Sequence, residues 1–109
     1  MRVAVVVGTR PEAIKLAPVV HALREARGAD PVVFSTGQHL EMAHQALSMF
    51  GLVPDRNLGI ARPTNSPTDL LAAGVAELGA EIGVGEFDWV LVQGDTTSAL
   101  AGALAGMAH

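Results

Sequence analysis

Short apolar runs, each followed by a glycine, alternate with helical patterns along this chain, and the alternation limits the folds open to it. The runs cover residues 3–7, 32–34 and 89–92, and the glycines that follow them are Gly8, Gly37 and Gly94. Such runs are typical of strands buried on both faces of a parallel sheet. We therefore predict three strands in an α/β layer fold with right-handed crossovers.

The first helix is predicted to begin at Pro11 and to end near Gly28. Proline suits the first helical position, because the N–H that it lacks would have no partner there. Pro18 lies inside the helix and should kink it by removing one hydrogen bond. The face turned toward the sheet is expected to consist of Leu16, Val20 and Leu23.

Three further helices are predicted in the rest of the chain. The second covers about 40–50, with Phe50 among its inward residues, and a long connection with three prolines follows over 52–67. The last helix begins at a cap formed by Thr97 or Ser98. The third helix has one apolar stripe, formed by Leu71, Val75, Leu78 and Ile82. Other large apolar side chains expected to pack inside are Met42, Met49 and Trp89.

Composition excludes several classes of protein. Seven basic and eleven acidic residues give a formal charge of −4, which lacks the basic footprint of nucleic-acid binding. The longest apolar run, residues 99–108, is half as long as the roughly 20 residues of a membrane span. There is no cysteine, and no histidine pair has zinc-site spacing with a third ligand, so we expect no metal. A cytoplasmic protein without nucleic-acid or membrane partners is the expectation.

The turn after the first run has cations placed for an anion. A glycine turn that leads into a helix is expected to aim backbone N–H groups at a ligand crevice. Arg10 offers a fork of donors for phosphate oxygens, and Lys15 adds a point charge one helical turn further on. Neither a Walker loop nor a GxGxxG pattern is present. The alternative is a plain strand–helix turn with two solvated cations.

Asp95 follows the third run and precedes the last helix. In open α/β sheets, ligands bind beyond the carboxyl ends of the strands. If the first strand is central, the turns after the first and third runs face one crevice. Asp95 is then a candidate acid or base, sugar-hydroxyl ligand or metal ligand, and its alternative role is to cap the helix.

Gln38 and His39 follow the second run. Their side chains could hydrogen-bond a ligand or cap the next helix. A surface position is the alternative for His39.

Four segments, taken in this order, resemble the non-hydrolysing UDP-N-acetylglucosamine 2-epimerases. They are GTRPEAIKLAPVVHAL, TGQHLEM, FGLVPD and VLVQGDTTSAL, and the resemblance covers essentially the whole chain. It implies a Rossmann-like three-layer α/β/α domain that is the N-terminal half of a GT-B-type two-domain fold. Residues 1–109 would be part of that half, and the C-terminal nucleotide-binding domain would be absent from this chain. The apolar last helix also suggests a truncated chain.

The resemblance implies an isomerase that interconverts UDP-N-acetylglucosamine and UDP-N-acetylmannosamine by eliminating UDP and adding it back. No cofactor or metal is implied, and the full-length protein would be a homodimer. The isolated chain is expected to be inactive. The alternative is a non-catalytic half-domain that binds an anion or a partner.

Site residues carry over from the same resemblance. Asp95 matches the catalytic-site aspartate of the family, and Arg10 and Lys15 match its substrate-contacting basic residues. Gln38 and His39 match a motif that helps bind a second UDP-N-acetylglucosamine as an allosteric activator. The residue after this motif, Leu40, stands where many members have a basic residue.

Overall fold

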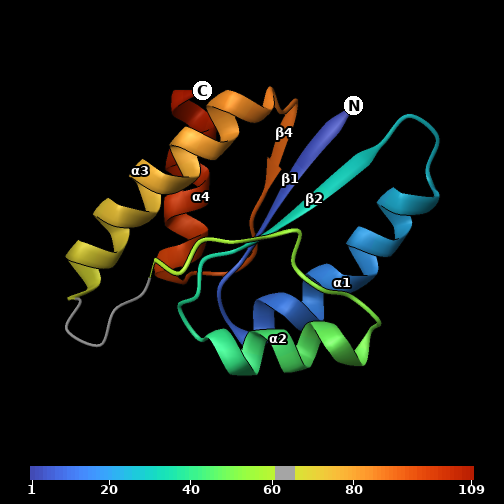
Figure 1. Ribbon diagram of the computed structural model, residues 1–109, viewed down its shortest axis with the longest axis horizontal. Coiled ribbons are helices and arrows are strands. Elements are labelled where there is room, and N and C mark those ends of the chain that lie inside the picture. Colours follow the sequence, from blue (N-terminus) through green and yellow to red (C-terminus); the bar gives the residue numbers. More distant parts are fainter. Residues whose placement is uncertain (61–65) are drawn as a thin grey trace.

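A parallel sheet with helices on both faces organises residues 1–60 and 66–109, which the computed structural model describes (Figure 1). In chain order the elements are β1 (Arg2–Val7), α1 (Arg10–Glu25), β2 (Asp30–Ser35), α2 (Leu40–Met49), β3 (Arg56–Asn57), α3 (Pro67–Gly85), β4 (Trp89–Leu91) and α4 (Thr97–Ala108). The described strands lie in the order β3-β2-β1-β4. The predicted α/β class with a parallel sheet is confirmed.

Strand β1 is the central strand that the sequence suggested. It pairs in parallel with β2 along its whole length and with β4 over three residues. Its side chains alternate between two cores: Val3, Val5 and Val7 pack toward α1 and α2, whereas Ala4 and Val6 pack toward α3 and α4. All five are buried, and each buried valine contributes about 1.5 kcal/mol or more to folding.

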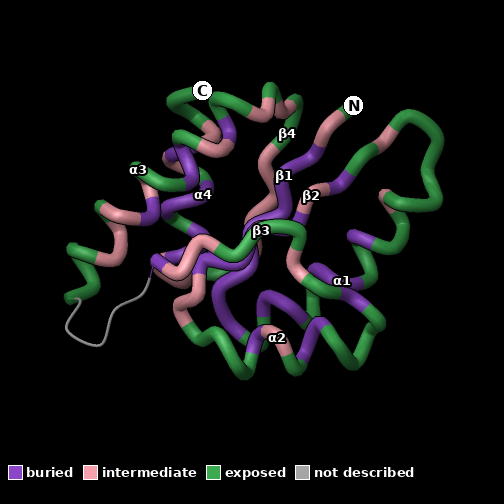
Figure 2. The backbone as a smooth tube through the Cα atoms, in the orientation of Figure 1, coloured by how far each residue is buried: buried purple, intermediate pink, exposed green. Residues whose placement is uncertain are grey.

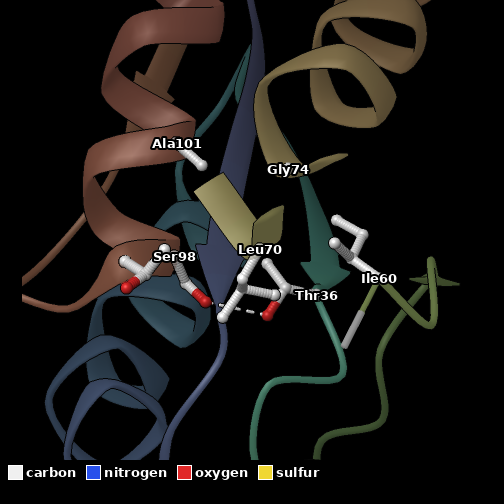
Figure 3. Close-up of a pocket in the computed structure, with 7 residues that line it drawn as sticks. Thr36, Ile60, Leu70, Gly74, Ser98 and Ala101 are labelled. Carbon is white, nitrogen blue, oxygen red and sulfur yellow. Dashed lines mark hydrogen bonds between the residues drawn. The ribbon is translucent and has the colours of Figure 1, made fainter. Parts of the chain in front are cut away.

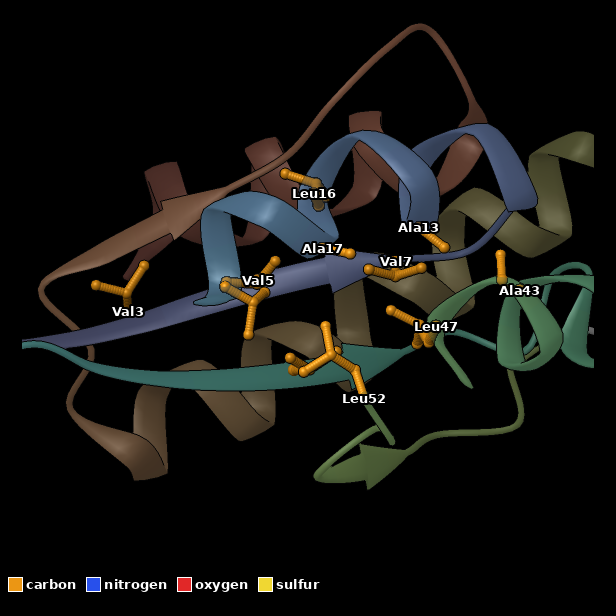
Figure 4. Packing of buried hydrophobic residues seen from close by; sticks show 12 residues of the cluster. Val3, Val5, Val7, Ala13, Leu16, Ala17, Ala43, Leu47 and Leu52 are labelled. Atoms are coloured by element: carbon orange, nitrogen blue, oxygen red, sulfur yellow. The ribbon is translucent and has the colours of Figure 1, made fainter. Parts of the chain in front are cut away.

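The first core lies between the sheet and the helices α1 and α2 (Figure 4). Small side chains line both helices here, so the helices pack close to the strands. The buried members are Val3, Val5, Val7, Ala13, Leu16, Ala17, Val20, Val33, Ala43, Ala46, Leu47 and Leu52.

The second core lies on the opposite face, beneath α3 and α4. It confirms the predicted stripe of the third helix: Leu78 and Ile82 are buried, and Leu71 and Val75 pack against them. The rings of Phe34 and Phe87 meet edge to face there, with centroids 5.6 Å apart. In the part of the chain that the structure describes, two helices on each face therefore complete the three layers.

The prediction of three strands was wrong, because a fourth lies within the segment expected to be a long connection. Strand β3 pairs in parallel with the end of β2. Asp55 precedes it and accepts a hydrogen bond of 2.7 Å from the Val33 N–H. Arg56 forms an ion pair with Glu81 at 2.6 Å. A strand of two residues is too short to leave a periodic pattern in the sequence.

The end of α2 also differs from the prediction. Phe50 is the C-terminal cap and is about one-third exposed, rather than inward, and Ala46 is buried instead. Gly51 has a left-handed φ of +72°, and the N–H groups of Gly51 and Leu52 bond to the carbonyls of Ser48 and Leu47. This is a Schellman motif, which turns the chain so that Leu52 rather than Phe50 enters the core.

Exposure corrects three further expectations (Figure 2). Met42, Met49 and Trp89 are each more than half exposed, although packing was expected for them.

Helix α1 continues through Pro18 but ends at Glu25, before the predicted stop near Gly28. Among the described residues, no helix is both long and apolar enough to cross a membrane.

Candidate functional site

Two turns lie side by side where β1 and its neighbour β4 end. The first follows β1 and begins at Gly8, and the second follows β4 and contains Gly94, Asp95 and Thr96. Because β1 and β4 are hydrogen-bonded parallel neighbours, with Val5 opposite Leu91, both turns leave the same edge of the sheet. The predicted neighbourhood of the two turns is confirmed.

Glu12 connects these two turns, and the sequence reasoning missed it. Its Oε1 accepts hydrogen bonds from the N–H groups of Gly8, at 2.8 Å, and Thr9, at 3.1 Å. Its Oε2 accepts a hydrogen bond from the hydroxyl of Thr96. The residue is only 1% exposed. The sequence does contain a signal for the contact between Glu12 and the start of the helix, because Thr9 and Glu12 have the Thr-x-x-Glu spacing of a capping box.

The Glu12 contacts change how an anion can bind at the start of α1. The N–H groups of Gly8 and Thr9 were expected to face a ligand, but they donate to the Glu12 carboxylate instead. In the described part of the chain, the buried Thr9 hydroxyl has no hydrogen-bond partner. Positive charge at this edge is therefore available mainly from the side chains of Arg10 and Lys15.

Close packing requires glycine at position 8. A Cβ atom at this position would lie 2.6 Å from Ser98 Cβ and 2.7 Å from Thr36 Oγ1. Such distances are shorter than any side chain tolerates without movement of its neighbours. Glycine here allows the end of β1, the residue after β2 and the first turn of α4 to meet.

A closed ring of hydrogen bonds joins the turn after β2 to the start of α4. The Gln38 N–H donates to Thr36 Oγ1 at 3.2 Å, and Ser98 Oγ donates to Gln38 Oε1 at 2.5 Å. Because Ser98 uses its proton in this bond, Thr36 is the donor in the 2.9 Å contact between the two hydroxyls (Figure 3). The ring turns the amide oxygen of Gln38 inward and leaves its NH₂ group as the donor for a ligand.

The crevice beside this ring is small. It is lined by Thr36, Ile60 and residues of α3 and α4, among them Ser98, and its empty volume is about 160 Å³ (Figure 3). Pockets for small molecules have volumes of about 300 Å³ or more. The crevice is therefore a packing seam, and a ligand of nucleotide size has to lie outside it.

Asp95 borders a larger hollow and remains exposed. The hollow has an empty volume of about 580 Å³, including space open to solvent, and its other walls come from the end of β4 and from α4. Gly94 precedes Asp95 with a left-handed φ of +85°, which only glycine adopts readily. Thr96, not Thr97 or Ser98, caps α4 by accepting a 3.2 Å hydrogen bond from the Ala99 N–H. The capping role considered for Asp95 therefore belongs to Thr96.

The remaining predicted site residues lie around these turns. Arg10 and Lys15 are exposed on α1. Lys15 follows Glu12 by three positions, a spacing that puts both residues on one side of the helix. His39 is exposed at the cap position of α2, where its side chain forms no capping bond; its backbone N–H donates to the Gly8 carbonyl at 2.8 Å.

Asp95 is thus an exposed carboxylate on the turn after β4, and Arg10 and Lys15 are exposed cations on α1, the helix that follows β1. Neither Arg10, Lys15 nor Asp95 forms a hydrogen bond or ion pair through its side chain within residues 1–60 and 66–109. Their charges are free to interact with a ligand. A carboxylate in this setting is suited to proton transfer, and the two cations are suited to a phosphate group.

Comparisons with known proteins point to one family. A family profile described as UDP-N-acetylglucosamine 2-epimerase matches residues 21–109. A putative UDP-N-acetylglucosamine 2-epimerase of Thermotoga maritima is 43% identical over 109 residues, which are 100% of this chain and 29% of that protein. The corresponding Escherichia coli protein is 44% identical over 105 residues, covering 96% of this chain and 28% of its own length.

A solved structure agrees with these sequence matches. The UDP-GlcNAc 2-epimerase from Neisseria meningitidis, bound to UDP-GlcNAc, superimposes with a TM-score of 0.90 at 40% identity. The match covers 96% of this chain and 28% of that one. The chain spans less than a third of the length of the relatives that it matches.

Proposed function

This chain belongs to the UDP-N-acetylglucosamine 2-epimerase family, and on that premise we propose that it forms one wall of the active site of a non-hydrolysing epimerase. Residues 1–109 are part of the N-terminal Rossmann-like domain of a GT-B-type protein. The C-terminal nucleotide-binding domain lies outside this chain. This division is supported by the 28–29% of the relatives' length that the chain matches.

The proposed reaction interconverts UDP-N-acetylglucosamine and UDP-N-acetylmannosamine. A base removes the C2 proton, the electrons of that C–H bond form the C1–C2 double bond, and UDP leaves C1 with the electron pair of the C–O bond. UDP then adds back to C1 while a proton is delivered to the opposite face of C2. The step conserves electrons, so it needs no external oxidant or reductant.

Asp95 is the acid–base group that this chain contributes. The single observation that carries the proposal is its carboxylate, which is exposed beside a hollow, has no partner in the described part of the chain and stands on a turn beside the central strand. A positioned acid or base contributes roughly 10²–10⁴-fold to such a reaction.

Arg10 and Lys15 stabilise the charge that grows on the diphosphate as UDP departs. Guanidinium groups pair with phosphate oxygens through two parallel hydrogen bonds, and an ammonium group adds a point charge. The Gly8 and Thr9 N–H groups are occupied by Glu12, so these two side chains carry the charge stabilisation from this part of the chain. Such preorganised charge is a large contribution to catalysis.

Gln38 and His39 contact the substrate or a second, activating UDP-N-acetylglucosamine. Gln38 presents its amide NH₂ group because the Ser98 hydroxyl binds its oxygen, and His39 is exposed beside it.

The complete protein is proposed to act in the cytoplasm as a homodimer, without metal or redox cofactor.

A chimera tests the function. These 109 residues replace the matching N-terminal part of the Thermotoga maritima relative, and UDP-N-acetylglucosamine is supplied. We expect UDP-N-acetylmannosamine to form, without release of free N-acetylmannosamine. A folded chimera that forms no epimer, while the parent relative does, would overturn the proposal. Sequencing the gene beyond the His109 codon tests the domain assignment in parallel.

A non-catalytic anion-binding module is the second candidate, favoured by the two cations Arg10 and Lys15, whose side chains have no partner in the described part of the chain. Calorimetry of the isolated chain with UDP separates the two. The epimerase proposal predicts a Kd above about 1 mM, since most of the nucleotide contacts lie in the other domain. A micromolar complex with the isolated chain would favour the module.

A further inference from the structure

We propose that Glu12 is the positioning residue for Asp95, a role that rests on the proposed function in which Asp95 transfers a proton. Glu12 is almost fully buried, and a buried carboxylate is tolerated only where donors surround it. The donors that the structure describes are the N–H groups of Gly8 and Thr9 and the hydroxyl of Thr96. They belong to the two turns that border the site.

Thr96 transmits this constraint to Asp95. Its hydroxyl donates to Glu12 and accepts from the Ala99 N–H, so the oxygen is fixed relative to α1 and α4 together. On the other side of Asp95, Gly94 adds backbone freedom and no side chain. Asp95 has no side-chain partner of its own among the described residues, so its direction depends on the anchored neighbour.

Four variants of the 109-residue chain separate this role from general stability. Glu12→Ala removes the hydrogen bonds that connect the two turns. Glu12→Gln keeps the connection, because the glutamine amide oxygen accepts from the N–H groups of Gly8 and Thr9 and the glutamine NH₂ group donates to the Thr96 hydroxyl. Thr96→Val removes the contact with Glu12 together with the cap bond to the Ala99 N–H, and leaves the bonds of Glu12 to the first turn. Ser66→Ala is the matched control, because Ser66 caps α3 through the same kind of bond.

Amide NMR gives the first readout, with melting temperature as the check on folding. In Glu12→Ala and in Thr96→Val we expect the Asp95 amide signal to shift and the order parameter of this amide to fall. It should stay near wild type in Glu12→Gln and in Ser66→Ala. An unchanged, rigid Asp95 turn in folded Thr96→Val would overturn the proposal, even if Glu12→Ala does not fold.

Kinetics of the chimera give the second readout. A displacement of about 1 Å in a reacting group costs roughly 100-fold in rate, so Glu12→Ala should lower kcat by roughly 10- to 100-fold and change KM little. Glu12→Gln should recover most of kcat. Equal losses in both variants would show that the charge of Glu12 acts directly, and would overturn the positioning role.

These readouts distinguish the failure of this inference from the failure of the proposed function. If Asp95→Asn keeps the full rate of the chimera, the catalytic assignment of Asp95 fails, whatever the NMR of the Glu12 variants reveals. If Asp95→Asn is inactive while the Glu12 variants change neither order nor kcat, only the positioning role fails.

Discussion

Ser98 donates a hydrogen bond of 2.5 Å to the side-chain oxygen of Gln38, a residue that precedes it by 60 positions. The bond brings the end of β2 and the start of α4 together across the end of β1. With Thr36 it completes a ring in which each proton has a defined acceptor. The ring orients Gln38 and fixes the edge of the sheet at which the proposed site lies.

Ser98→Ala should destabilise the chain by about 1–3 kcal/mol. The variant leaves the buried hydroxyl of Thr36 and the oxygen of Gln38 without this partner, and an unsatisfied buried polar group costs about that much. Urea unfolding measures the change. Thr97→Ala is the neighbouring control and should change stability by less; equal losses would show that the ring adds nothing.

Gly8→Ala should also destabilise the chain, by about 1–3 kcal/mol, because the new Cβ would overlap Ser98 and Thr36. Combining it with Ser98→Gly removes one of the two collisions. The loss in the free energy of unfolding of the double variant should therefore be smaller than the sum of the losses of the two single variants. Thermal or urea unfolding measures all three. Strict additivity would mean that the two residues do not collide.

Two adjacent residues test where the first core ends. Leu52 is 1% exposed and Val53 is 72% exposed, because the Schellman turn after α2 directs the chain inward at Leu52. Leu52→Ala should cost about 2–5 kcal/mol in the free energy of unfolding. Val53→Ala should stay within about 0.5 kcal/mol. Similar values for the two variants would contradict the turn.

Arg10→Gln and Lys15→Gln should each lower kcat/KM of the chimera by roughly 10- to 100-fold, since a hydrogen bond to a charged group is worth about 1.5–3 kcal/mol. Added salt should lower the kcat/KM of the wild-type chimera by a larger factor than that of either variant. Arg24→Gln is the control, because Arg24 is exposed in the last turn of the same helix. A comparable loss in Arg24→Gln would indicate a general charge effect instead of specific contacts.

The fold was predictable from the sequence where the pattern is local. Apolar runs followed by Gly8 and Gly94 predicted the parallel strands, and the stripe of α3 predicted its buried face. Strand β3 was missed because it has two residues and depends on pairing with β2. Phe50 was misplaced because helical periodicity does not register that the helix ends one residue earlier.

The candidate site was predictable only in part. Asp95 and the neighbouring turn followed from the rule that ligands bind beyond strand ends. Glu12 was missed because its function depends on Thr96, which lies 84 positions away, and the local Thr-x-x-Glu spacing indicates only a helix cap. The occupation of the Gly8 and Thr9 N–H groups is instead a local contact, which the Thr-x-x-Glu spacing indicates and the prediction of an anion site overlooked.

Deuterium incorporation tests the central claim most directly. The chimera is incubated with UDP-N-acetylglucosamine in D₂O, and proton NMR follows the signal of H2 on the sugar. The account predicts that deuterium replaces H2 as the epimer forms, and that Asp95→Asn slows this exchange by roughly 10²–10⁴-fold while Glu77→Gln on α3 does not. Exchange at the wild-type rate in a folded Asp95→Asn chimera would contradict the account.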